Sequence, residues 1–179
     1  ASDVYKRQHD TLLHGQSYPS KARVDASRIC ITGRSSGGLT VLCALIQYPD
    51  IFCAASSSYG ISDLKSLSQH THKYELHYTT TLMGGTYEDF PGVYKARSAL
   101  HHADKIRTPL LLLQGDQDRV VAPDQSRRMA RAIESHAGKI KYIEFPSEGH
   151  GFRRSDTRQR ALEEEFAWCN DAARIPEVC

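Results

Sequence analysis

This 179-residue chain has little net charge, no long apolar run and no regular pattern of cysteines. The 23 Lys and Arg residues nearly balance the 21 Asp and Glu residues, and a formal net charge of +2 is too small to predict binding to nucleic acid. No apolar run approaches the ~20 residues that span a bilayer, and no charged-then-apolar leader opens the chain. We therefore expect neither a nucleic-acid partner nor a membrane partner.

The cysteines give no sign of a disulfide framework or a metal site. They are five in number, unevenly spaced and without a CxxC pair, which favours reduced thiols and a cytoplasmic location. Closely spaced histidines at positions 70, 72 and 77 suggest a metal site, but no partner carboxylate accompanies them. We predict no metal and no cofactor.

The pattern of apolar residues predicts alternating strands and helices. Strands are expected at 28–32, 52–59, 110–113 and 139–145, and helices at 39–47, 124–135 and 157–172, the last burying Leu162, Phe166 and Trp168. Residues 61–108 are irregular and polar, with helical pieces near 64–69 and 74–84. This order predicts an α/β fold: a mostly parallel sheet of about four strands, flanked by helices on both faces.

The segment GRSSGG, residues 33–38, joins the first predicted strand to the first predicted helix. GRSSG matches G-x-S-x-G, the strained turn that lifts a nucleophilic serine above a sheet, and here that serine is Ser35. We expect Gly33 and Gly37 to be required because a side chain at either would clash with the strand and helix. The helix N-terminus makes the Ser36 N–H an oxyanion donor. The alternative is a plain loop of small residues.

Two further candidates follow later strands. Asp118 follows the third strand and His150 the fourth, which gives the order Ser, Asp, His of an α/β-hydrolase triad. Parallel strands place all three loops at one edge of the sheet. Taken alone, each residue has a structural alternative, since Asp118 could shape a turn, Asp116 competes for its role, and His150 could be an exposed loop residue.

Several segments together resemble the catalytic domain of the prolyl oligopeptidase family of serine peptidases, in its dipeptidyl-peptidase and acylaminoacyl-peptidase branch. They are VDASRICITGRSSGG, SSSYGISDL followed by THKYE, TPLLLLQGDQDRVV with its G-x-x-D-x-x-V form, and EGHGF. The resemblance extends over residues 24–170.

The resemblance implies a role for each matching position. Ser35 corresponds to the nucleophile, Asp118 to the orienting acid and His150 to the general base. In G-x-x-D-x-x-V, Asp118 rather than Asp116 is the matching aspartate, and Val121 matches an apolar residue of the substrate pocket. Tyr59 is expected near the same pocket. The implied substrates are short peptides, and the family also allows a homo-oligomer of the full-length protein.

The same comparison predicts that the chain is a fragment. Residues 24–179 correspond to the C-terminal part of a partial α/β-hydrolase fold, whose first four strands and upstream β-propeller are expected to be missing. Residues 1–23 form a poorly defined segment, and residues 3–8 (DVYKRQ) match one reading frame of a transposase sequencing adapter. We expect these six residues to be an adapter artefact. Three functions stay open: a serine-type peptidase, a carboxylesterase and a catalytically inert fragment.

Overall fold

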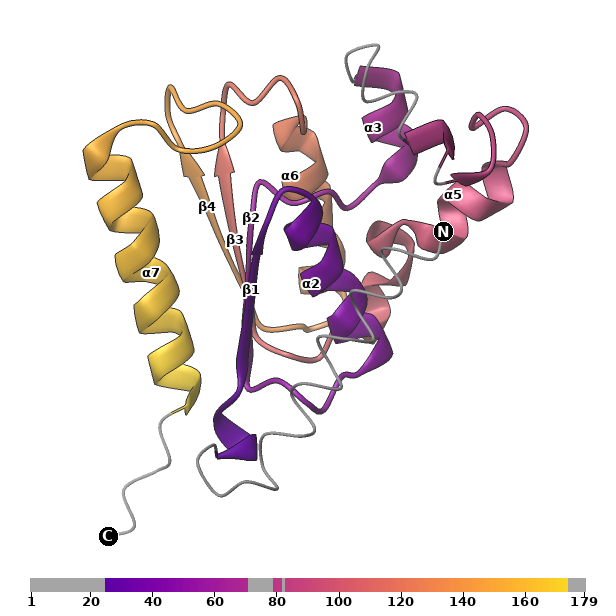
Figure 1. Ribbon diagram of the computed structural model, residues 1–179. Coiled ribbons are helices and arrows are strands. Elements are labelled where there is room, and N and C mark those ends of the chain that lie inside the picture. The colour runs from indigo at the N-terminus through magenta and orange to yellow at the C-terminus, as the bar shows by residue number, and fades with distance from the viewer. Residues whose placement is uncertain (1–24, 71–78, 82, 174–179) are drawn as a thin grey trace, which may run out of the picture.

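The structure, a computed structural model, describes residues 25–70, 79–81 and 83–173 (Figure 1). Its centre is a parallel sheet in the order β1-β2-β3-β4. The strands are β1 (Cys30–Arg34), β2 (Ala54–Ser58), β3 (Leu110–Gly115) and β4 (Ile140–Phe145). The predicted sheet of four parallel strands flanked by helices is therefore confirmed.

Helices cover both faces of the sheet. On one face lie α2 (Ser36–Gln47) and α6 (Pro123–Ser135), and on the other lies α7 (Ser155–Ala173), as Figure 1 shows. Shorter elements are the 3-10 helices η2 (Ala26–Arg28) and η3 (Ala99–Lys105) and the helices α3 (Leu64–His70) and α5 (Pro91–Arg97). The helical piece expected at 64–69 is confirmed, whereas most of the one expected at 74–84 lies outside the described residues.

The leucines of β3 divide the core between the two layers. Leu110 and Leu112 belong to the cluster that α2 and α6 complete, while Leu111 and Leu113 pack with Ala161 of α7. Successive side chains of a strand point to opposite faces, so a run of four leucines supplies both layers. All four are at most 3% exposed, which explains why this strand is the clearest in the sequence.

Several predicted boundaries and the predicted burial of two side chains are wrong. β1 lies two residues beyond its expected place because the polar segment from Thr32 to Arg34 pairs through its backbone with β2. α2 begins at Ser36 rather than 39, and α5 and η3 were not predicted. On α7, Leu162 and Phe166 are 56% and 74% exposed, because the helix packs against β2 and β3 through its Ala161 side.

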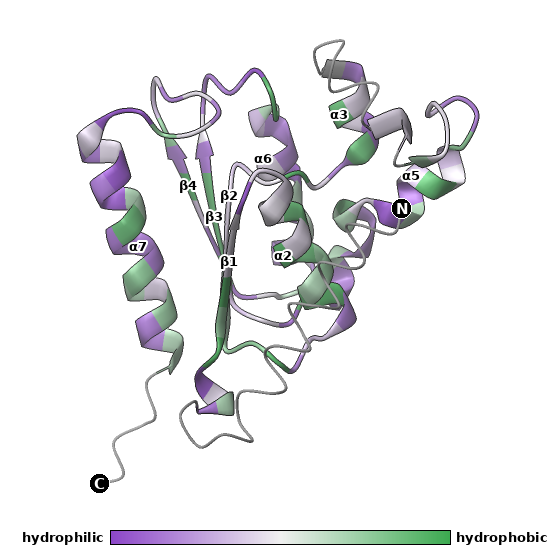
Figure 2. Cartoon of the chain, viewed as in Figure 1, coloured by the Kyte–Doolittle hydropathy of each residue, from purple (hydrophilic) through white to green (hydrophobic). Residues whose placement is uncertain are grey.

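The carboxyl ends of the four strands meet at one edge of the sheet, where ligands bind in open α/β folds. In Figure 2 much of the loop structure beyond these strand ends has hydrophilic colouring, whereas the strands carry both hydrophobic and hydrophilic colouring. No helix among the described residues is long and apolar enough to cross a membrane.

Candidate active site

Four of the six residues expected at the site follow four different strands of the sheet. Ser35 directly follows β1, Tyr59 follows β2, Asp118 lies just beyond β3, and His150 lies in the loop between β4 and α7 (Figure 1). The parallel topology therefore brings together residues that are far apart in the sequence.

Ser35 occupies a strained turn between β1 and α2. Its backbone has φ 53° and ψ −119°, a conformation that non-glycine residues rarely adopt and that is costly to maintain. The Ser35 N–H donates to the Ser58 carbonyl at 3.0 Å, and the Ser35 carbonyl accepts from the N–H of Gly38. These bonds on either side hold the serine at the N-terminal end of α2.

The glycines of the turn do not all have the role that was expected. A Cβ on Gly33 would lie 2.3 Å from the Gly37 carbonyl oxygen, so close packing does require this glycine. A Cβ on Gly37 would meet nothing within 4 Å, and the prediction for that residue is wrong. The second position that requires glycine is Gly38, one residue later, since a Cβ there would lie 2.6 Å from the Cα of Gly60. The helix packs tightly against the loop after β2 at Gly38, whereas Gly37 faces open space.

A continuous chain of hydrogen bonds links Ser35, His150 and Asp118. The Ser35 Oγ lies 2.8 Å from Nε2 of His150, and Nδ1 of His150 lies 2.9 Å from Oδ2 of Asp118. An ionised carboxylate only accepts, so Nδ1 carries the hydrogen, and in the neutral ring Nε2 accepts from the serine hydroxyl. The Asp118 side chain is fully buried, whereas that of His150 is 21% exposed.

The environment of Asp118 favours its ionised form. Burial by itself would raise the pKa of Asp118, but hydrogen bonds from His150 and from the N–H groups of Val121 and Val120 outweigh it and lower the pKa below its usual value. Both N–H groups donate to Oδ1 at 2.9 Å. The carboxylate is thus held in place as an anion beside the imidazole.

Asp116, which competes with Asp118 in the sequence, has a different partner. Its Oδ1 accepts the N–H of Ser147 at 2.7 Å, and the residue is exposed. This bond ties the loop after β3 to the loop after β4. Asp118, not Asp116, is the hydrogen-bond partner of His150.

Glu148 was not among the predicted site residues, yet it organises the loop that carries His150. The residue is only 2% exposed, and its carboxylate accepts the N–H groups of Arg153 and Arg154 at 2.8 and 3.1 Å. Burial would raise the pKa of Glu148, and these two backbone bonds are among the contacts that lower it instead. A carboxylate two residues before the histidine in EGHGF was the only signal in the sequence.

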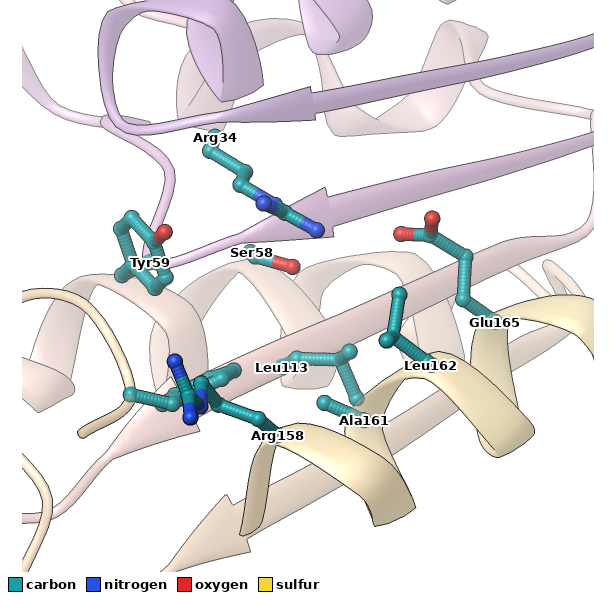
Figure 3. Close-up of a pocket in the computed structure, with 9 residues that line it drawn as sticks. Arg34, Ser58, Tyr59, Leu113, Arg158, Ala161, Leu162 and Glu165 are labelled. Atoms are coloured by element: carbon teal, nitrogen blue, oxygen red, sulfur yellow. The ribbon is translucent and has the colours of Figure 1, made fainter. Parts of the chain in front are cut away.

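A cavity of about 130 Å³ lies beside the site, between the strand ends and α7 (Figure 3). Its lining includes Arg34, Tyr59, Phe152, Arg158, Leu162 and Glu165. The Tyr59 ring meets the rings of His150 and Phe152 edge to face, at centroid distances of 4.9 and 5.2 Å. Val121 does not border this cavity; it is 1% exposed and reaches the site through its N–H.

The thiols and histidines of the described segments assemble no metal site. No group of three or more His, Cys, Asp or Glu residues there could hold a metal ion. Two of the three histidines considered from the sequence, His72 and His77, lie outside the described residues, as does the THKYE segment. Cys30, Cys43, Cys53 and Cys169 are half-buried. Burial raises the pKa of Cys30 and Cys53 to about 11, as expected of unreactive thiols.

Parallel strands, helices on both faces and a serine on a strained strand-to-helix turn define an α/β-hydrolase fold. Within that class the chain belongs to the prolyl oligopeptidase family, whose model matches residues 6–175. Similar proteins include dipeptidyl aminopeptidase BIII of Pseudoxanthomonas mexicana, 30% identical over 86% of this chain and 23% of its own length. Esterase LipQ of Mycobacterium tuberculosis is 28% identical over 72% of this chain and 34% of its own length.

Solved structures of the family superpose on the chain. A puromycin-hydrolyzing peptidase of Mycobacterium tuberculosis is 40% identical, with a TM-score of 0.86 over 93% of this chain and 25% of that one. The chain thus spans about a quarter of the length of this structure and of the dipeptidyl aminopeptidase. These similarities show the family and the fold of the chain.

Proposed function

We propose that this chain is part of a serine-type peptidase that hydrolyses peptide bonds of short peptides through an acyl-enzyme. The observation that carries the proposal is the hydrogen-bonded chain from Ser35 through His150 to the buried carboxylate of Asp118. This arrangement supports Ser35 as the nucleophile, His150 as the general base and Asp118 as the orienting acid.

In this mechanism Ser35 Oγ attacks the carbonyl carbon of the scissile bond while His150 Nε2 takes the hydroxyl proton. Asp118 stays ionised, keeps the second imidazole hydrogen on Nδ1 and stabilises the imidazolium. His150 then returns the proton to the leaving amine, and the acyl group remains on Ser35. Water, deprotonated by the same imidazole, then attacks the acyl carbon, the bond to Ser35 Oγ breaks, and the imidazolium returns the proton to that oxygen as the acid product leaves.

The N-terminal end of α2 supplies one donor for the oxyanion. Ser36 is the first residue of this helix, so the helix itself does not use its N–H. The positive end of the helix dipole points the same way and favours negative charge on the carbonyl oxygen. We assign the Ser36 side chain no role in the reaction.

Tyr59 and Val121 complete the proposed site, with unequal support. The Tyr59 ring borders the cavity and packs against His150, which suits a residue that contacts substrate. Val121 is buried and donates its N–H to Asp118, so we assign it support of the pocket from within the core.

Peptides are the proposed substrates because dipeptidyl aminopeptidase BIII and the puromycin-hydrolyzing structure are named as peptidases. A second candidate is ester hydrolysis, favoured by the relative named esterase LipQ and by a triad chemistry that serves esters as well as amides. The third, an inert fragment, follows from the chain spanning only about a quarter of those two peptidases.

Steady-state assays separate these three functions. Aminoacyl- and dipeptidyl-arylamides are compared with short p-nitrophenyl esters, using the 179-residue chain and its Ser35→Ala variant. Arylamide hydrolysis that disappears in the variant supports the peptidase. Hydrolysis of esters alone supports the carboxylesterase, and no hydrolysis by a folded chain supports the inert fragment.

A further inference from the structure

Gln114 lies in the core directly behind Asp118, on the penultimate residue of β3. The residue is fully buried at 0% exposure, which is unusual for a glutamine and requires partners for both ends of its amide. Its Nε2 donates to Oδ2 of Asp118 at 3.0 Å. The Oγ–H of Ser126, on α6, donates to the Gln114 Oε1 at 2.8 Å.

The surroundings fix which way the amide points. Around Nε2 lie three oxygen acceptors, namely Oδ2 of Asp118 and, at 3.3 and 3.4 Å, the carbonyl oxygens of Gly115 and Val121. A flipped amide would place its own oxygen against all three and would leave them without this donor. The amide therefore presents its N–H groups to the carboxylate, and Ser126 holds the opposite end.

We propose that Gln114 is a positioning residue of the triad: it fixes the Asp118 oxygen that faces His150. The carboxylate receives two donors on each oxygen, the backbone N–H groups of Val120 and Val121 on Oδ1 and Gln114 with His150 on Oδ2. Without Gln114, Oδ2 would keep only its bond to the imidazole. The inference rests on the proposed function, because it assigns Gln114 a part in that same triad.

The physical basis is preorganisation. When the imidazole takes the serine proton, positive charge develops next to Oδ2, which lies 2.9 Å from Nδ1. A carboxylate that four donors already hold need not rotate as this charge develops, so the reaction has no reorganisation cost at this point. Misplacement of a catalytic group by about 1 Å can cost on the order of 100-fold in rate.

The first test removes the donor with an uncharged side chain of similar length. We expect Gln114→Met to react with a fluorophosphonate about 10- to 100-fold more slowly at Ser35 than the wild-type chain. Gln117→Met is the matched control, because the Gln117 side chain is exposed in the loop after β3 and the substitution keeps its backbone N–H, so this variant should react at the wild-type rate. Denaturant unfolding of each variant confirms that the reacting population is folded. Equal rates in both variants would overturn the proposal.

The second test adds a pH readout that a purely structural role would not produce. In Gln114→Glu the introduced carboxyl group can donate to Asp118 while protonated but repels it once ionised, and the neighbouring carboxylate raises its pKa. The labelling rate relative to wild type should therefore fall as pH rises through that titration. Gln117→Glu adds the same charge at an exposed position and should give a constant ratio. A constant ratio for Gln114→Glu would contradict the proposal.

A spectroscopic measurement separates failure of this inference from failure of the proposed function. The His150 Nδ1–H gives an NMR signal, assigned by its loss in His150→Gln, whose exchange with water reports the bond to Asp118 without any catalysis. We expect faster exchange in Gln114→Met and unchanged exchange in Gln117→Met. A folded wild-type chain that does not react with the fluorophosphonate would refute the proposed function. Unchanged exchange of the Nδ1–H in Gln114→Met would refute the role of Gln114.

Discussion

Nε2 of His150 lies 2.8 Å from Oγ of Ser35, although the two residues are 115 positions apart and follow strands at opposite edges of the four-stranded sheet. The loop after β4 must therefore reach back across the ends of β3 and β2. It is held there by the Glu148 carboxylate within the loop, by the Gln117 N–H on the Glu148 carbonyl and by the Asp116 carboxylate on Ser147. The site thus depends as much on this loop as on the turn that carries the serine.

The first prediction separates the two neighbouring aspartates. Asp118→Asn should lower kcat by about 10⁴-fold, because an amide in that place favours the wrong imidazole tautomer. Asp116→Asn should stay within a few-fold of wild type, since the amide oxygen can still accept the Ser147 N–H. Measuring kcat for both variants on the best substrate decides between them, and a large loss in Asp116→Asn alone would reverse our assignment.

The second prediction concerns the two adjacent glycines of α2. Gly38→Ala should cost about 1–3 kcal/mol in the free energy of unfolding, because its Cβ would press on the Gly60 Cα and the Ser57 hydroxyl. Gly37→Ala should change that free energy by less than about 1 kcal/mol, since its Cβ would meet nothing within 4 Å. Urea unfolding of the two variants provides the comparison, and equal costs would show that the packing at Gly38 is misdescribed.

The third prediction is that protonation of Glu148 accounts for part of the stability that the protein loses in acid. The pKa of Glu148 is lower in the folded protein than its ordinary value of 4.5, so protons bind more tightly to the unfolded chain. The stabilisation from its carboxylate is complete above that ordinary value and is lost as the pH falls through the lower, folded-state pKa. Glu148→Gln removes this contribution and should be less stable at pH 7.

The measurement is the urea midpoint between pH 7 and pH 3. Wild type should lose stability steeply below about pH 4.5, whereas Glu148→Gln should lose less over the same interval. Glu134→Gln is the control, because Glu134 is exposed on α6 and its loss should leave the wild-type pH dependence intact. Parallel curves for wild type and Glu148→Gln would contradict the assigned role of the buried carboxylate.

The features that could be predicted from the sequence are those whose evidence lies within a single segment. The run of leucines in β3 and the alternation of apolar and polar residues in β4 each predict a strand, because the residue types alone indicate which side chains are buried. Ser35, Asp118 and His150 could be predicted to lie at one edge because each follows a strand of its own, and the carboxyl ends of parallel strands lie at the same edge. The polar end of β1 was missed because its pairing is through the backbone.

The remaining features depend on partners that are distant in the sequence or in another layer. A glutamine in a leucine strand and a glutamate beside a glycine give no sign of burial, and only the folded positions of Ser126 and Arg153 explain Gln114 and Glu148. Likewise, the constraint at Gly38 rather than Gly37 comes from the loop after β2. Such contacts cannot be read from one segment.

The central claim is that Ser35 is an activated nucleophile, and covalent labelling with a fluorophosphonate tests it most directly. Mass mapping of the labelled 179-residue chain should find one adduct, on Ser35 of the peptide that contains the GRSSGG turn. Ser36→Ala should retain labelling, whereas Ser35→Ala and His150→Gln should lose it. A folded wild-type chain that takes no label, or a Ser35→Ala variant labelled at the wild-type rate, would contradict the account.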